Sequence, residues 1–359
     1  MRKLIIPILL FAATAAFAQD GQPVVLAAAR GGRIEVRDSG LQLMATLAVN
    51  PGLESISISP DGHTMYLAQE GSHTGGCCGL FTLNLETHEM CSFSSQGMFA
   101  TPSLDGRFIF TQGEHGVDFF DASNLERRLP MRAPGTYHLQ PSPDGRWLLG
   151  ITNSPKPSLD IFDMQSQTLA RQLNIPAGPA MGAWTGEQFH ILNYTPPGKA
   201  QLWNIKADDT KLPEPKEIQL RDLHAACNQP VLLTLAGSAD RLFLAEAFGY
   251  KMDRRRACPG ARTGGIYTID PTSGSAQLIA PSVHVNRMVA SPDGHDLYVL
   301  QSAAAGQTGS ARLLHIDARS GNTISSATLT PDDWSLLYAR IPHELVPHGY
   351  VRAGLGCAR

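Results

Sequence analysis

The sequence predicts an all-β fold, a seven-bladed β-propeller, and three observations support this prediction. The turn Ser-Pro-Asp-Gly precedes a short apolar strand at residues 59–62, 142–145 and 291–294, and Ser-Leu-Asp-Gly at 103–106 is a fourth copy. Helical periodicity is nearly absent, while short β-rich runs separated by Gly, Pro, Asn and Asp dominate. An incomplete repeat remains at each end of the chain.

The recurring turn has a definite local chemistry. Its second residue, Pro in three of the copies, fixes φ, Asp caps the turn, and Gly accepts a positive φ, so each copy is a β-turn between two strands. Gly62, Gly106 and Gly145 are 44 and 39 residues apart, which is close to the propeller repeat length of about 40–50 residues.

Each repeat is written as four strands, A to D, in which the turn joins A to B. The first three repeats place their strands at 55–58, 65–69, 79–85 and 89–93, then 98–101, 108–112, 117–121 and a weak 127–129, then 137–140, 147–152, 159–163 and 169–174. The fourth repeat loses the Asp-Gly pair, and the fifth is the most degenerate. Repeats four to six place theirs at 180–184, 189–193, 201–205 and 216–220, then 230–235, 242–245, 265–269 and 276–279, then 286–290, 297–301, 312–316 and 323–329.

The two ends of the chain complete a seventh blade. After the sixth repeat one strand pattern is left, at 336–340, and three strands before the first turn are unassigned, at 24–28, 33–37 and 43–49. One C-terminal and three N-terminal strands close the ring, and closure removes the exposed sheet edges that invite aggregation. The structural alternative is a two-domain β-sandwich arrangement, which does not require a repeating turn at fixed spacing.

The first eighteen residues have the pattern of a secretory signal peptide. Arg2 and Lys3 form a charged start, residues 4–16 are apolar, and Ala-Phe-Ala at 16–18 is a cleavage site. The apolar run is too short for a membrane span, and no later stretch is long enough. We therefore expect a signal peptide at 1–18, one propeller domain at 19–359, and a periplasmic or secreted protein.

Charge and cysteine content narrow the classes of partner. A formal net charge of −3 argues against nucleic acid or an anionic membrane as the main partner. The six cysteines all follow the signal peptide, and in an oxidising compartment disulfide bonds are the simplest interpretation. Spacing alone does not give their pairing. The cysteines are Cys77, Cys78, Cys91, Cys227, Cys258 and Cys357.

The repeats also resemble a known family. Ser-Pro-Asp-Gly, an apolar strand, and then a strand ending in Asp, as at 161–163 and 315–317, resemble the YVTN-type repeats of periplasmic seven-bladed propellers. YncE-like proteins and the heavy subunit of quinoprotein amine dehydrogenases share that fold family. The resemblance covers most of the mature chain but lies in scaffold residues. It implies a fold and a compartment, and it transfers no catalytic residue.

The order of strands sorts the loops onto two faces. If strand A runs from top to bottom, the A–B and C–D turns lie on the bottom and the B–C and D–A connections lie on the top. We expect function on the top, because loops on a rigid scaffold usually carry it. The candidate residues in these connections are His73, Cys77, Cys78, His224, Cys227, Arg254, Arg255, Arg256 and Cys258.

Three hypotheses account for these residues. A Cys227–Cys258 disulfide would staple the Arg-rich loop of blade five. Alternatively, a soft metal site of His73, Cys77 and Cys78 facing His224 or Cys227 would suit copper or zinc, although the spacing matches no ligand signature and no cofactor is predicted from a motif. The third hypothesis is that the arginines at 254–256 bind carboxylates or phosphates of a partner.

The inner strands offer weaker candidates. Glu54, His138, Asn286 and Arg287 fall on A strands, where they would line the central channel and bind a small ligand, or simply hold channel water. No nucleophile elbow, zinc-protease motif or phosphate-binding loop is present in the sequence.

The prediction is therefore an exported binding or assembly module that presents its top loops to a protein partner or a small ligand. The alternatives are a subunit of a periplasmic oxidoreductase of the amine-dehydrogenase type, or a metal-dependent lactonase or hydrolase.

Overall fold

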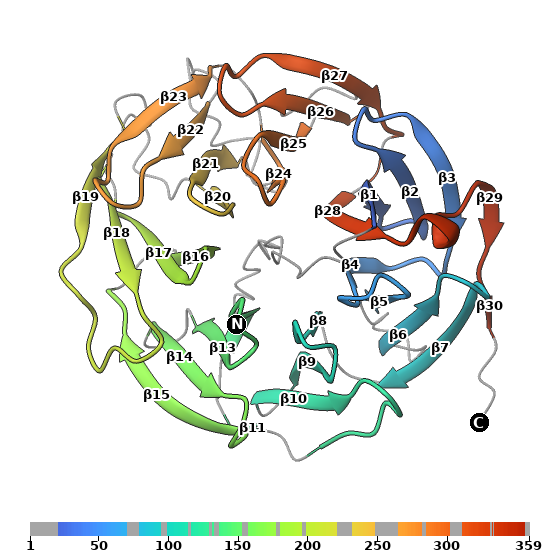
Figure 1. Cartoon of the computed structure of the whole chain (residues 1–359), viewed down its shortest axis with the longest axis horizontal. Helices are drawn as coiled ribbons and strands as arrows, with labels where there is room; N and C mark the ends of the chain where they lie inside the picture. The colour runs from blue at the N-terminus through green and yellow to red at the C-terminus, as the bar shows by residue number, and fades with distance from the viewer. Residues whose placement is uncertain are drawn as a thin grey trace, which may run out of the picture.

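The computed structural model shows seven sheets, each with four antiparallel strands at its base, arranged in a ring (Figure 1). The predicted signal peptide lies outside the described residues. The structure describes residues 21–69, 79–94, 99–113, 116–128, 131–132, 136–152, 157–176, 180–195, 199–220, 232–247, 265–281, 285–301, 311–330, 332 and 334–355. Within this part of the chain there is no α-helix, and one 3-10 turn spans His343–Leu345.

Six blades follow the predicted order, each from its innermost to its outermost strand. Blades one to three consist of β4 (Leu53–Ile58), β5 (Thr64–Gln69), β6 (Gly79–Asn84) and β7 (Glu89–Ser94); β8 (Ala100–Pro102), β9 (Phe108–Gly113), β10 (Gly116–Asp121) and β11 (Met131–Arg132); and β12 (Thr136–Pro141), β13 (Trp147–Thr152), β14 (Ser158–Asp163) and β15 (Thr168–Asn174). Blades four to six consist of β16 (Ala180–Thr185), β17 (Gln188–Thr195), β18 (Lys199–Ile205) and β19 (Lys216–Gln219); β20 (Leu232–Gly237), β21 (Leu242–Ala247), β22 (Ile266–Ile269) and β23 (Ala276–Ala280); and β24 (Arg287–Ala290), β25 (Asp296–Gln301), β26 (Arg312–Asp317) and β27 (Thr323–Thr328).

Blade seven closes the ring as the sequence predicts. It contains β28 (Trp334–Ile341) as its innermost strand, followed by β1 (Gln22–Ala29), β2 (Arg33–Asp38) and β3 (Leu43–Ala48). The C-terminal β28 pairs with the N-terminal β1 along its whole length, from Gln22 opposite Ile341 to Ala29 opposite Trp334. The closure by one C-terminal and three N-terminal strands is confirmed.

The end of the chain departs from the prediction. Two further strands, β29 (Gly349–Arg352) and β30 (Gly354–Leu355), pair in parallel with β3 and β7 respectively. They therefore extend the outer edges of blades seven and one, which lie on either side of the ring closure. In blade two, the weak strand expected at 127–129 is reduced to a bridge between Phe120 and Arg127, and the edge strand β11 lies a few residues later.

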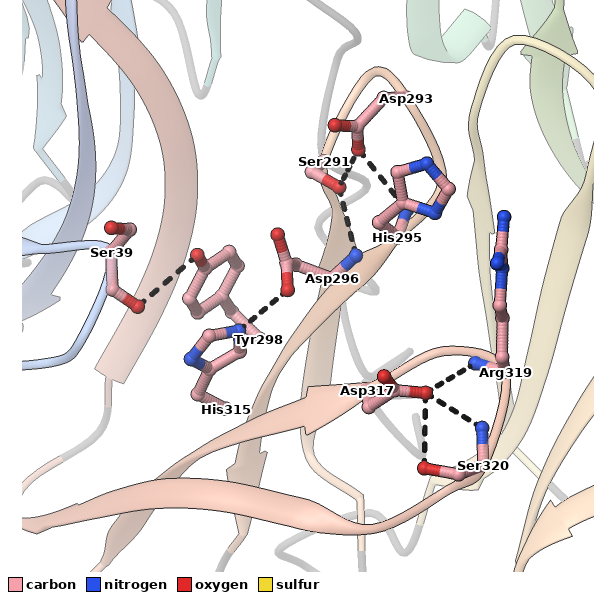
Figure 2. A network of polar contacts seen from close by, with 10 residues as sticks. All are labelled: Ser39, Ser291, Asp293, His295, Asp296, Tyr298, His315, Asp317, Arg319 and Ser320. Carbon is pink, nitrogen blue, oxygen red and sulfur yellow. Dashed lines mark hydrogen bonds and ion pairs between the residues drawn. The ribbon is translucent and has the colours of Figure 1, made fainter.

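The four recurring turns have the same hydrogen bonds. At 291–296, Ser291 Oγ donates to Asp293 Oδ1 over 2.6 Å and accepts from the backbone N–H of Asp296 at 3.0 Å (Figure 2). Asp293 Oδ1 also accepts from the backbone N–H of His295 at 3.0 Å, and Gly294 has a φ of 70°. Equivalent Ser–Asp bonds of 2.5–2.6 Å recur in the turns at 59, 103 and 142. Side chains thus satisfy the turn backbone, as their chemistry predicts.

The apolar core is divided among the interfaces between neighbouring blades. One cluster joins blades three and four through residues such as Ile161 and Trp184, and another joins blades six and seven through residues such as Val289 and Leu336. Polar side chains also join adjacent inner strands. Gln140 Nε2 of β12 donates to the carbonyl of Gly182 in β16 over 2.8 Å.

His190 of β17 is a fully buried titratable group within blade four. Its Nδ1 lies 2.9 Å from Asn204 Oδ1, and its Nε2 lies 2.6 Å from Thr185 Oγ1. Asn204 Nδ2 donates to the carbonyl of Pro271 over 2.7 Å, which fixes its Oδ1 as the atom facing the ring. Nδ1 therefore carries the proton and Nε2 accepts from the hydroxyl. Burial lowers the pKa of His190 to about 4, and the nearby Lys216 charge also lowers it, against the raising effect of the Asn204 bond.

We expect this histidine to make stability depend on pH. An unfolded histidine titrates near pH 6.5, so between about pH 6.5 and 4 only the unfolded chain takes up the proton. The free energy of unfolding should therefore fall by up to about 3 kcal/mol as the pH drops through this window. Urea denaturation at pH 7 and pH 4.5 measures the change. A His190→Gln variant should lose most of it, and an unchanged pH dependence in that variant would contradict the assignment.

Candidate functional site

The two faces of the ring differ in how their strand ends are joined. On the bottom face, residues 59–63 join β4 to β5 and residues 85–88 join β6 to β7. On the top face, residues 70–78 join β5 to β6 and residues 248–265 join β21 to β22. The antiparallel strand order confirms that the A–B and C–D turns lie on one face and the B–C and D–A connections on the other.

Most predicted site residues lie outside the described part of the chain, so their roles stay predictions. These are His73, Cys77, Cys78, His224, Cys227, Arg254, Arg255, Arg256 and Cys258. The described strands before these segments, such as β5 and β21, end on the top face, and the strands after them, such as β6 and β22, begin there. Of the inner-strand candidates, His138 falls on β12, and its side chain lies outside the description.

Asn286 and Arg287 are placed where the sequence predicts, at the top end of the innermost strand of blade six. The backbone N–H of Asn286 donates to the carbonyl of Leu300 over 2.7 Å, which holds this end of β24 against β25. Both side chains are half-buried. The inner strands β24, β28 and β4 are successive neighbours in the ring (Figure 1), so the tops of blades six, seven and one form a continuous rim.

Glu54 occupies the same rim on β4 of blade one. Its Oε1 lies 3.1 Å from Nη2 of Arg30, at the top end of β1. The Arg30 side chain is 41% exposed and that of Glu54 is 20% exposed, so this ion pair faces solvent in part. It bridges blade seven to blade one across the closure of the ring.

A second cationic group on this rim was missed by the sequence analysis. Arg33 begins β2, its Nη2 lies 3.2 Å from Glu35 Oε1, and its guanidinium sits 5.1 Å from the centre of the Trp334 ring. The indole Nε1 of Trp334 donates to the carbonyl of Thr330 over 3.0 Å. We call Arg30, Arg33, Glu54 and Trp334 the closure rim. The only sequence signal for it is the pair of arginines flanking a Gly-Gly turn at 31–32.

On the bottom face, charged side chains form hydrogen bonds with neighbouring residues of the scaffold. Figure 2 shows Asp317 accepting from the backbone and hydroxyl of Ser320 and from the backbone of Arg319. The Ser320 backbone bond is the main cause that lowers the pKa of Asp317. In the same blade, Asp296 Oδ1 lies 2.7 Å from Nε2 of His315, whose ring stacks on Tyr298. These contacts stabilise the turns and strands of blade six.

Within the described residues, no group of three or more His, Cys, Asp or Glu side chains is arranged to hold a metal ion. In that same part of the chain, no helix has the length and apolar character that crossing a bilayer requires. The copper or zinc hypothesis concerns residues outside the description and stays a prediction.

Comparison with known proteins supports the architecture. No family model matches the chain, and no curated protein matches its sequence. Among solved structures, it is similar to hydrazine synthase of Kuenenia stuttgartiensis, with 14% identity, a TM-score of 0.55, and coverage of 75% of this chain and 77% of that one. It is also similar to the dihydro-heme d1 dehydrogenase NirN in complex with DHE, with 13% identity, a TM-score of 0.56, and coverage of 94% and 78%. The likeness shows a β-propeller fold. At these identities it shows the fold alone, and a YncE-like or amine-dehydrogenase membership is not established by it.

Proposed function

We propose that this protein is an exported propeller that acts as a binding or assembly module, with its top face as the contact surface. The signal-peptide pattern at residues 1–18 supports export. The observation that carries the proposal is that the two longest connections between described strands, residues 220–231 and 248–265, both join strand ends on the top face, whereas the recurring turns on the bottom face are closed by their own Ser and Asp side chains. Long loops on a rigid scaffold are the usual place of recognition, although the fold itself hosts many functions.

The partner that best fits the top face bears carboxylates or phosphates. Arg30, Arg33 and Arg287 lie at the top ends of strands β1, β2 and β24. The arginines at 254–256 belong to the segment that joins two top strand ends of blade five. Guanidinium groups bind carboxylates and phosphates through paired hydrogen bonds. Because Arg30 and Arg33 pair with Glu54 and Glu35, the arginines at 254–256 are the main support for an acidic protein surface or a small anionic ligand. Our proposal commits to an acidic protein surface.

A second candidate is a subunit of a periplasmic oxidoreductase, in which the propeller docks a smaller redox protein. Its support is that both similar structures are named as enzymes, a hydrazine synthase and a dihydro-heme d1 dehydrogenase. A metal-dependent lactonase or hydrolase is the third candidate, and it would need a metal held by carboxylates or histidines. The metal would have to be bound outside the described residues.

Affinity capture separates these candidates. The full chain, immobilised and exposed to an extract of its native compartment, should retain a protein, and a variant with Arg254, Arg255 and Arg256 changed to Ala should retain it at least about tenfold more weakly. A retained partner without visible absorbance supports the binding module, and one with a haem or quinone spectrum supports the redox subunit. Equal retention by wild type and variant would overturn the arginine contact.

A further inference from the structure

The C-terminal part of the chain holds blade seven from both edges. The strand order of this sheet is β28, β1, β2, β3 and β29, so the three N-terminal strands lie between two C-terminal ones (Figure 1). The inner strand β28 is antiparallel to β1, and the outer strand β29 is parallel to β3, from Gly349 opposite Ala45 to Arg352 opposite Ala48. We call residues 349–355, which contain β29 and β30, the strap.

The strap also reaches the neighbouring blade. Its Ala353 N–H donates to the carbonyl of Ala48 at the end of β3 over 3.0 Å, and its Gly354 N–H donates to the carbonyl of His88, just before β7, over 3.1 Å. β30 then pairs with β7. One short segment therefore joins the outermost strands of blades seven and one.

Alternate side chains of the strap contact the apolar core between these two blades. Val351 and Ala353 are half-buried and pack against a cluster that includes Leu47 of β3 and Met90 of β7. Tyr350, by contrast, is 73% exposed. The strap thus covers the outer end of an apolar core to which both blades contribute, with the period of two that a strand requires.

The link between β28 and the strap is short and fixed. Residues 342–348 join the two, and Leu345 and Val346 within them are buried in the same apolar cluster. Fully extended, this link spans at most about 28 Å. Since β28 and β29 are four strand spacings apart, about 19 Å, the link has little slack. β28 can therefore move only a short way from β1 while the strap stays paired.

We propose that the strap is a clasp of the ring, which has to release before β28 can separate from β1. The pairing of β28 with β1 is where the two ends of the chain close the propeller, so the clasp sets how often the ring opens. While bound, the strap also covers the outer edges of β3 and β7, and uncovered strand edges are sites of unwanted pairing. This inference is independent of the proposed binding function.

Hydrogen exchange of the full chain, followed by mass spectrometry of its peptides, tests the clasp. Val351→Asp places a charge at a half-buried apolar contact and should detach the strap. We expect the amides of β28 and β1 to exchange at least about tenfold faster in this variant, because their opening no longer requires strap release. Amides of β13 in blade three should change by less than about twofold. The rate of unfolding in urea should also rise at least about tenfold.

Two further variants complete the test. Tyr350→Asp adds the same charge to the same strand at an exposed position and should stay within about twofold of wild type in both measurements. Ala353→Pro removes the donor to the Ala48 carbonyl without adding a charge, and it should act in the same direction as Val351→Asp. Faster exchange confined to residues 349–355, with β28 and β1 unchanged, would overturn the proposal, as would equal effects of Val351→Asp and Tyr350→Asp.

Discussion

Replacing Glu35 by leucine is expected to lower the free energy of unfolding by about 3–5 kcal/mol, because it leaves a buried guanidinium without its counter-charge. Glu35 and Arg37 lie on β2 with side chains that are 9% exposed. Arg37 Nε and Nη2 donate to Glu35 Oε2 over 3.0 and 2.6 Å, and Nη1 donates to the carbonyl of Leu41 over 2.7 Å. Without the carboxylate, the Arg37 charge keeps its burial and loses its counter-charge. Urea denaturation of the purified protein measures the loss.

A double variant separates the lost counter-charge from lost packing. With Glu35 and Arg37 both changed to Leu, the buried Arg37 charge is gone. The partly exposed Arg33 still loses Glu35, as it does in the single variant, and the Leu41 carbonyl loses its donor. Buried ion pairs replaced by apolar residues often cost little. We therefore expect the double variant to be at least about 2 kcal/mol more stable than the single Glu35→Leu variant. A double variant as unstable as the single one would show that the charge is not the cause.

Replacing Gly237 by alanine is expected to destabilise the protein by about 3 kcal/mol through overpacking between inner strands. A Cβ at Gly237 of β20 would lie 2.0 Å from the carbonyl oxygen of Trp184 and 3.0 Å from its carbonyl carbon in β16. Both contacts involve backbone, which cannot rotate away as a side chain can. Blades four and five would have to separate locally, and their shared apolar cluster would loosen.

The chain offers a matched control for this substitution. Gly354 on β30 has no atom within 4 Å of its would-be Cβ and is exposed. Gly354→Ala should therefore change the free energy of unfolding by less than about 0.5 kcal/mol, which leaves the denaturation midpoint nearly unchanged. A Gly237→Ala protein with a midpoint near that of Gly354→Ala would mean that the inner strands are not packed as closely as the structure indicates.

Much of the scaffold was predictable because its signals are local. The turn at 291–294 closes through its own Ser and Asp side chains, so its sequence alone defines it. The strands on either side alternate or run apolar in the expected way, and the incomplete patterns at the two ends match each other. Closure of the seventh blade follows from counting strands, without any knowledge of contacts.

Other features were not predictable because they depend on distant parts of the chain. β29 and β30 are short and lack an apolar pattern, and they exist through parallel pairing with strands some 300 residues earlier for β29 and 265 for β30. Glu35 and Arg37 have the spacing of a solvent-facing polar row, yet the neighbouring turn and Arg33 enclose them. The contact of Arg33 with Trp334 on the closure rim likewise requires the ring to be closed.

The binding role of the top face is the central claim, and one comparison tests it most directly. The wild-type chain, the top-face variant with Arg254, Arg255 and Arg256 changed to Ala, and a bottom-face variant with Arg107, Arg146 and Arg319 changed to Ala should be titrated against the captured partner. The three bottom-face arginines are exposed and give the same change in charge. We predict that the top-face variant binds at least about tenfold more weakly than wild type, while the bottom-face variant binds within about twofold of it. Weakened binding by the bottom-face variant with unaltered binding by the top-face variant would contradict the account.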